Sequence, residues 1–294
     1  MSTTPPVTPY KWLFALFQYL LPHHLLSRLM GKITHCRIDW VKLTYMKTII
    51  RQFNVDVSEA AEQNLDRYEH FNAFFTRQLK EGARTFVSGD ENIASPVDGS
   101  VSQAGEITEG RIFQAKGHDY SLTTLLGGED DWSTRFNGGN FTTLYLSPRD
   151  YHRIHMPMDA SLREMRHVPG RLFSVSPSTV RTIPGLFARN ERVVCLFDTA
   201  SGPMAMILVG AIFVASVDTV WHGTVTPPTR PDIQTWQYGH DGNYIRLAKG
   251  EEMGRFNMGS TVILLYGPQQ IQWVSELVAD APVQMGQQIA TLSR

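Results

Sequence analysis

The stretch that decides the fold is the apolar run Met204-Ala-Met-Ile-Leu-Val-Gly-Ala-Ile-Phe-Val-Ala-Ser-Val217. These residues are too uniformly apolar for a strand with one exposed face, so we expect them to be buried on both sides. Their valines, isoleucines and phenylalanine favour strands. Gly210 leaves two interpretations open, because the run is either two buried strands around the glycine or one long strand.

The sequence around this run has a similar character. From residue 83 onward, short apolar runs rich in Val, Ile and aromatic residues alternate with Gly, Pro, Asp and Asn, which form turns. Three further runs predict strands: Phe141–Leu146, Arg192–Phe197 and Thr261–Tyr266. The body of the protein is therefore expected to be rich in β-structure.

Earlier in the chain the pattern is helical. Residues 57–82 carry Ala, Leu and Phe at helical spacing behind Ser58, which suits an N-cap, and they predict a helix. We therefore predict an α+β protein in which N-terminal amphipathic helices, residues 1–56, precede a β-rich catalytic body, residues 57–294.

Composition excludes several classes of protein. The chain has 294 residues, which suits one large domain or two small ones, and 42% of them are hydrophobic, enough for a sizeable core. A net charge of −1 argues against a general nucleic-acid-binding surface, so no nucleic acid is expected as a partner. The two cysteines, Cys36 and Cys195, cannot form a disulfide framework, which indicates a reducing compartment.

The first fifty residues differ from the rest, because they hold six basic residues and one acid. The run Trp12–Leu21 has nine apolar residues in ten, but Pro22 ends it well short of the ~20 residues needed to cross a bilayer. No cleavage site of a secretory signal follows. We predict two interfacial helices, Tyr10–Leu21 and Leu25–Ile33, on an anionic membrane surface. The alternative is a helical hairpin packed on this protein's own core or on a partner.

Three polar stretches contain residue types that carry chemistry. Ser95-Pro-Val-Asp98-Gly-Ser, taken alone, is typical of a turn. Tyr145–Pro157 contains His152 and His155, and an imidazole can serve as a general base, whereas His-x-x-His without clear third and fourth ligands is poor support for zinc. Gly254–Thr261, taken alone, is an ordinary turn before a strand. There is no G-x-S-x-G elbow, which disfavours an α/β-hydrolase.

Together these stretches resemble the phosphatidylserine decarboxylases, the pyruvoyl-dependent enzymes of bacterial and mitochondrial membranes. The resemblance runs from about Phe71 to Gly267 in unchanged order, and length and motif order look like the shorter bacterial form. Met258 replaces the leucine of the family's usual Leu-Gly-Ser-Thr cleavage motif, a change that conserves volume and polarity. The matching segments are FNAFFTRQLK, SPVDGSV, RIFQAKGHDYSL, TTLYLSPRDYHRIHMP, VPGRLFSV, IPGLFARNERVVCLFDT and KGEEMGRFNMGST.

The resemblance implies a proenzyme that cuts itself between Gly259 and Ser260. The Ser260 hydroxyl would attack the Gly259 carbonyl, and elimination and hydrolysis would leave a covalently bound pyruvoyl group at position 260. The products would be a β chain, residues 1–259, and an α chain, residues 260–294, which form a heterodimer. No metal is implied, and the state of higher oligomerisation stays open.

The same resemblance assigns roles to side chains. Asp98, His155 and Ser260 would form the relay for self-cleavage, and His152 would act on the substrate, as a proton donor. Asp150 would orient the histidine loop and Thr261 the neighbouring backbone. The sequence alone does not divide the roles of the two histidines, because residues three apart share a face in a helical turn and not in an extended segment.

By resemblance, the pyruvoyl carbonyl would form a Schiff base with the amine of phosphatidylserine, releasing CO2 and phosphatidylethanolamine. The location implied is peripheral, on the cytoplasmic face of the cell (inner) membrane. Three alternatives were weighed: an inactive membrane-bound relative acting as a scaffold, a pyruvoyl decarboxylase of a soluble amino acid, and a serine hydrolase that uses the same triad. The intact residues Asp98, His155 and Ser260 oppose the first, and the amphipathic N-terminus opposes the second.

Overall fold

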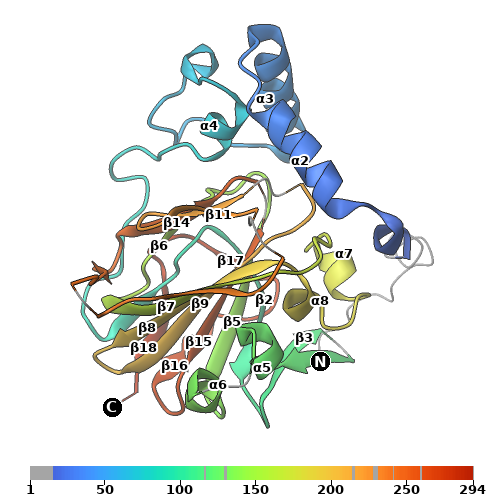
Figure 1. Cartoon of the computed structure of the whole chain (residues 1–294). Coiled ribbons are helices and arrows are strands. Elements are labelled where there is room, and N and C mark those ends of the chain that lie inside the picture. The colour runs from blue at the N-terminus through green and yellow to red at the C-terminus, as the bar shows by residue number, and fades with distance from the viewer. Residues whose placement is uncertain are drawn as a thin grey trace.

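A computed structural model describes residues 16–115, 117–128, 131–213, 216–227, 231–240, 242–258 and 260–293, and the side chain of Ser260 is outside this description. Helices gather at the N-terminal end and beside one sheet face, and strands form the body (Figure 1). The helices are α2 (His23–Thr34), α3 (Asp39–Phe53), α4 (Phe71–Phe75), α5 (Leu122–Leu126), α6 (Asp131–Phe136), α7 (Pro177–Val180) and α8 (Leu186–Arg189), with a 3-10 turn, η1 (Leu65–Arg67). The predicted α+β class is confirmed.

The largest sheet among the described residues has nine strands, and all its pairings are antiparallel. Its order is β12 (Gln234–Gln237), β7 (Ala160–Val168), β8 (Arg192–Thr199), β9 (Gly202–Val209), β15 (Ser260–Tyr266), β5 (Asn140–Leu146), β2 (Gly99–Glu106) and β17 (Pro282–Val283), with β13 (Arg246–Leu247) also on β7. The strands predicted at Phe141–Leu146, Arg192–Phe197 and Thr261–Tyr266 are confirmed as β5, β8 and β15.

Smaller sheets complete the body. A four-stranded sheet has the order β11 (Gly223–Thr226), β10 (Val217–Thr219), β14 (Glu252–Phe256) and β6 (Arg153–His155). A three-stranded sheet has the order β1 (Asn92–Ala94), β18 (Gln288–Leu292) and β16 (Ile271–Trp273), and β3 (Arg111–Ala115) pairs with β4 (His118–Ser121).

Residues 204–211 of the apolar run are buried because the large sheet has a hydrophobic core on each face, whereas Phe213 is 37% exposed. Alternate residues of β9 enter different cores: Met204, Met206 and Leu208 enter one, and Ala205, Ile207 and Val209 enter the other. This is the two-residue period of a strand that has no exposed face. The run is not one long strand, since β9 ends at Val209 and β10 begins only at Val217.

The helix predicted over residues 57–82 is wrong. In its place the chain doubles back, so that Ala60 bridges to Leu79, and only the short η1 and α4 are helical. Polar side chains cap the start of each short helix, so the chain begins a new helix at these points and does not continue one: Asn64 accepts from the backbone at the start of η1, and His70 Nδ1 accepts from Ala73 N at the start of α4. The phenylalanines of α4 pack on Met46 of α3, so tertiary contacts override helical spacing.

Candidate active site

Asp98 and Ser260 lie at the same end of three neighbouring strands. Asp98 immediately precedes β2, and Ser260 is the first residue of β15. Both strands run antiparallel to β5, which lies between them, so their first residues flank its end: Ser260 pairs with Leu146, and Ser100 pairs with Tyr145. The fold therefore brings together two positions that are 162 residues apart in the sequence.

The predicted histidine loop leaves β5 at this same end. It passes through a turn in which Asp150 Oδ2 accepts from Ser147 N at 2.7 Å, and then enters β6. His155 N donates to Pro96 O at 2.9 Å, close to Asp98. On its other side β6 pairs with β14, which leads to the predicted cleavage site, and Phe256 N donates to His152 O at 3.0 Å. The loop thus lies between the Asp98 turn and the segment that enters β15.

His155 is held in the tautomer of a general base. Its Nδ1 lies 2.8 Å from Gly250 O, and a carbonyl only accepts, so Nδ1 carries the proton. The lone pair therefore sits on Nε2, which accepts from the Tyr151 hydroxyl at 3.2 Å. Burial lowers the pKa of His155, which favours the neutral form, and the charge of Asp98 opposes this weakly.

His152 is fully buried and is held in the same tautomer. Its Nδ1 donates to Asp150 O at 2.7 Å, and its ring packs on Phe75 with centroids 4.0 Å apart. Nε2 has no hydrogen-bond partner among the described residues. Burial, with a smaller contribution from Arg77, lowers the pKa of His152 to about 3, so a neutral imidazole presents a free lone pair beside the cleavage segment.

Asp98 is buried and bound mainly to Arg84. Arg84 Nε and Nη2 donate to its carboxylate at 2.9 and 2.5 Å, and Met285 N donates to it at 2.8 Å. No hydrogen bond joins Asp98 to His155 among the described residues, because the imidazole Nδ1–H donates its hydrogen bond to Gly250 O.

The segment before Ser260 is fixed at two points. The Asn257 side chain accepts from Asn72 Nδ2 at 2.8 Å and donates to Asp218 Oδ2 at 2.8 Å. Met258 has φ of 114°, a conformation that costs a residue with a side chain about 1–3 kcal/mol. Gly259 is outside the described residues. The predicted cleavage site thus follows a strained residue where the chain passes from the four-stranded to the nine-stranded sheet.

A cavity of about 230 Å³ opens beside Asp98. Besides Asp98 it exposes Arg77, Arg149, Asp150 and Tyr151. Its complete lining is Asn54, Asp56, Glu59, Arg77, Leu79, Arg84, Asp98, Gly99, Arg149, Asp150, Tyr151, Pro282, Val283 and Gln284. Arg84, Tyr151 and Gly250 were not predicted as site residues, although Tyr151 lies inside the YLSPRDYHRIHMP motif that signals the loop.

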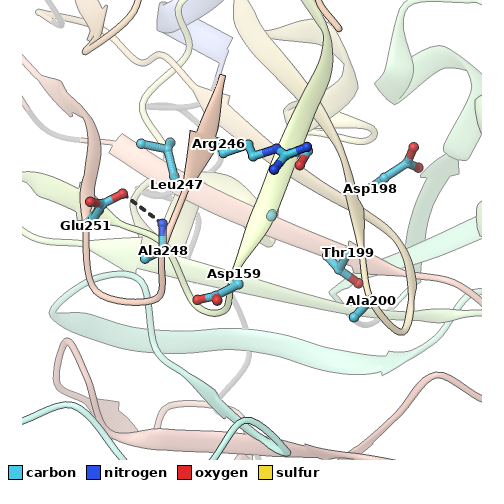
Figure 2. Close-up of a pocket in the computed structure, with 10 residues that line it drawn as sticks. Asp159, Asp198, Thr199, Ala200, Arg246, Leu247, Ala248 and Glu251 are labelled. Carbon is cyan, nitrogen blue, oxygen red and sulfur yellow. Dashed lines mark hydrogen bonds between the residues drawn. The ribbon is translucent and has the colours of Figure 1, made fainter. Parts of the chain in front are cut away.

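A second hollow, of about 550 Å³, lies at the strand ends around β7, β8 and β13 (Figure 2). None of the predicted site residues lines it. Two of its carboxylates are engaged within the protein, since Asp198 binds Arg135 and Arg163, and Glu251 accepts from Ala248 N.

The N-terminal helical segment turns its polar side toward the body. Of the predicted helix Tyr10–Leu21, residues 10–15 lie outside the described residues and residues 16–20 are helical. The predicted helix Leu25–Ile33 is confirmed within α2. Gln18 Oε1 accepts from Ser174 N at 2.8 Å, and the His23 ring packs on Phe173.

The apolar side of the same segment faces solvent. Leu20 is 82% exposed, and Leu25, Leu29 and Ile33, spaced four residues apart on α2, are each about half exposed. Such spacing places the three residues of α2 on one helical face. No helix within the described residues is long and apolar enough to cross a bilayer.

The sequence matches known proteins over most of its length. The family described as phosphatidylserine decarboxylase matches residues 71–291, and a second family description, PSD, matches residues 13–54. A phosphatidylserine decarboxylase proenzyme of Pseudomonas fluorescens Pf-5 is 56% identical over 278 residues, covering 94% of this chain and 96% of that protein. The proenzyme of Ectopseudomonas mendocina is 57% identical over 275 residues, covering 94% and 96%. With a match of this extent, the chain belongs to the phosphatidylserine decarboxylase family.

Proposed function

We propose that this protein is a phosphatidylserine decarboxylase that matures by cutting itself between Gly259 and Ser260. The observation that carries the proposal is the convergence of Asp98, the histidine loop and the start of β15 at one end of three adjacent strands. Family membership over most of the chain supports the substrate, phosphatidylserine.

In the proposed cleavage, His155 Nε2 takes the proton of the Ser260 hydroxyl as its oxygen attacks the Gly259 carbonyl. The lone pair on Nε2 is suited to this step once Tyr151 releases it, and Gly250 O keeps the ring oriented. Asp98 stabilises the imidazolium electrostatically. The backbone strain at Met258 would be relieved when the bond between Gly259 and Ser260 breaks, which favours cleavage.

The surroundings of position 260 suit a pyruvoyl group. His152 Nε2 and Thr261 Oγ1 are buried polar atoms without a partner among the described residues, and such atoms are costly unless something bonds to them. When bound, the pyruvoyl carbonyl supplies the electron sink that decarboxylation requires. The unprotonated Nε2 of His152 is proposed to take up a proton during the reaction and to return it to the substrate carbon, and the packing of Phe75 excludes water from the ring.

The two fragments are proposed to stay together as a heterodimer. The α chain, residues 260–294, contributes β15, which pairs with β5 and β9 of the β chain. It also contributes β17 and β18, which pair with β2 and β1. Cutting one peptide bond leaves these backbone ladders intact.

Intact mass of the denatured protein tests this function. We expect two chains that meet at residues 259 and 260, with the α chain lighter than a simple hydrolysis product because the serine nitrogen leaves as ammonia. A carbonyl reagent should label the α chain alone, and the mature protein should release CO2 from phosphatidylserine. An α chain that begins with an unmodified serine would indicate a hydrolase-like cleavage and contradict the proposal.

The exposed apolar side of the N-terminal segment is proposed to bind the anionic membrane surface that holds the substrate. Arg28 and Lys32 are exposed on the same helix, α2, where cations can meet lipid phosphates. The protein would then be peripheral on the cytoplasmic face of the membrane. The polar side of the N-terminal segment would hold that segment on the body through Gln18 and His23.

Replacing Leu20, Leu25 and Leu29 together by Gln should weaken binding to anionic vesicles about 100-fold, because each leucine forfeits about 1 kcal/mol of apolar burial. Self-cleavage should be unaffected, since it needs no lipid. Sedimentation with phosphatidylglycerol-containing vesicles measures the first quantity and a denaturing gel the second. Binding of the unmodified protein should weaken with salt but persist.

The matched control replaces Phe113, Val220 and Val278 by Gln, three residues that are also about half exposed but lie outside the N-terminal segment. This control should bind vesicles normally. Equal losses in both triple variants would show that general surface hydrophobicity, and not the N-terminal helices, holds the protein on the membrane.

A further inference from the structure

Arg77 is a buried arginine without a counter-ion. Its side chain is only 4% exposed, yet within the described part of the chain it forms no ion pair with a carboxylate. Its Nε has no hydrogen-bond partner among the residues that the structure describes. Its Nη2 makes one long hydrogen bond to Arg149 O at 3.4 Å, and its guanidinium lies 5.2 Å from the Phe74 ring. Burial lowers the pKa of Arg77, which reflects the cost of keeping this charge away from water.

Another buried arginine in the same protein shows what a purely structural role looks like. Arg192 is 2% exposed, and its guanidinium donates to four backbone carbonyls. Nε donates to Leu125 O, Nη1 donates to Ala188 O and Asn190 O, and Nη2 donates to Thr124 O. Every nitrogen of the Arg192 guanidinium thus donates a hydrogen bond. In contrast, most of the five N–H donors of Arg77 have no partner among the described residues. Packing alone does not account for a desolvated cation with unused donors.

Arg77 lines the 230 Å³ cavity beside Asp98, together with Arg149. The Arg149 side chain is 65% exposed, and within the described ranges its one ion pair is with Asp150, at 3.6 Å. The other cation of the lining, Arg84, is neutralised by Asp98 and Glu59. Two arginines are therefore available to an anion that enters this cavity.

The carboxylates of the same lining are already engaged. Asp98 and Glu59 bind Arg84, Asp150 Oδ2 accepts from Ser147 N, and Asp56 Oδ1 accepts from Ser58 N.

The cavity is connected to the reaction site through Asp150. Asp150 lines the cavity together with Arg77, and its carbonyl oxygen accepts from His152 Nδ1 at 2.7 Å; the Phe75 ring that packs on His152 lies two residues before Arg77 in the chain. A molecule whose reacting end lay at position 260 could therefore extend its other polar group into the cavity.

We propose that Arg77, with Arg149 at the mouth of the cavity, binds the phosphodiester of the phospholipid substrate. This inference rests on the proposed function, which supplies a substrate with two anionic groups, a carboxylate and a phosphodiester. An arginine on the carboxylate would stabilise the ground state and oppose loss of CO2, whereas one on the phosphodiester binds a group that does not react. Arginine forks also match phosphate oxygens in geometry.

The test uses the mature, self-cleaved protein and phosphatidylserine in mixed micelles. Arg77→Gln should raise KM about 30-fold with little change in kcat, as expected for loss of a charged hydrogen-bonded contact. Arg77→Lys, which keeps the charge but loses the fork, should raise KM by a smaller factor of about 5. Arg149→Gln should raise KM about 3-fold, because its side chain is exposed. All three variants should cut themselves as the unmodified protein does.

Two soluble inhibitors separate the phosphodiester from the rest of the headgroup. Glycerophosphoethanolamine carries the phosphodiester and ethanolamine does not. In Arg77→Gln, inhibition by the first should weaken about 30-fold, and inhibition by the second should be unchanged. Equal weakening of both would mean that Arg77 shapes the reaction site generally, which would overturn the proposal.

Arg192→Gln is the matched buried control, and it should lower thermal stability without changing KM. A wild-type KM in both Arg77 variants would overturn the inference and leave the proposed function intact. A fall in kcat at constant KM would also overturn it, since Arg77 would then act on the reacting groups.

If Arg77→Gln fails to fold, the KM values and the inhibition measured for Arg77→Lys and Arg149→Gln test the proposal in its place. Absence of any activity in the unmodified protein would instead contradict the function itself.

Discussion

Ser260→Ala should yield one uncut chain with no decarboxylase activity. Without the hydroxyl there is no nucleophile for the Gly259 carbonyl, so neither the cut nor the pyruvoyl group can form. The expected loss is complete within detection, at least about 10⁴-fold, since both the cofactor and the mature site are missing. A denaturing gel and an assay of CO2 release measure the two effects.

Ser100→Ala is the matched control, because Ser100 is the second residue of β2 and lies at the same end of the sheet as Ser260, the first residue of β15. It should cut itself normally. Ser260→Cys and Ser260→Thr each keep a nucleophile, so we expect slow cleavage from both. Two chains of the usual sizes from Ser260→Ala would refute the assigned cleavage site.

His155→Ala and Asp98→Asn should both accumulate the uncut precursor. Loss of a positioned general base slows a step by about 10²–10⁴-fold, and Asp98 supplies the charge that stabilises the protonated ring. The double variant should be little slower than either single one, because the residues act as a unit. Pulse-chase measurement of the precursor at 25 °C gives the rates.

The acidic limb of the cleavage rate follows from the pKa of His155. Burial lowers this pKa below its ordinary value of 6.5, so the neutral base persists to lower pH. The rate should therefore hold as pH falls through 6.5 and decline only at lower pH. A half-maximal rate above pH 6.5 would mean that the base is a different group or is not desolvated.

The two histidines are separated by His152→Ala, which should cut itself but decarboxylate poorly. The Nε2 atom of His152 has no hydrogen-bond partner among the described residues. His155 Nε2, in contrast, already accepts a hydrogen bond from the Tyr151 hydroxyl. Normal cleavage in His155→Ala, together with failure in His152→Ala, would mean that the two roles are exchanged.

Much of the strand framework follows from local sequence. The two-residue alternation within β9 and β15 is hidden because both faces are buried, but the β-branched and aromatic content still marks them as strands. The helix expected over residues 57–82 failed for the opposite reason. Phe71, Phe74 and Phe75 have helical spacing, but their burial against Met46 needs only one short turn of helix.

The sequence by itself determined the family and the order of its motifs. It also indicated Asp98, His152, His155 and Ser260 as the candidate site residues. Motif residues are recognisable without coordinates because their chemistry restricts which side chains can stand there. The sequence also indicated the amphipathic N-terminus, whose leucines are exposed in the structure.

Only the tertiary structure decided which partners those residues have. His155 Nδ1 donates a hydrogen bond to Gly250 O, and His152 Nδ1 donates one to Asp150 O. Asp98 binds Arg84. Backbone carbonyls carry no sequence signature, so no motif could reveal these bonds. The same holds for the charge of Arg77, which is buried and has no ion pair among the described residues. Burial and pairing arise from contacts between segments far apart in the chain, and local sequence does not encode such contacts.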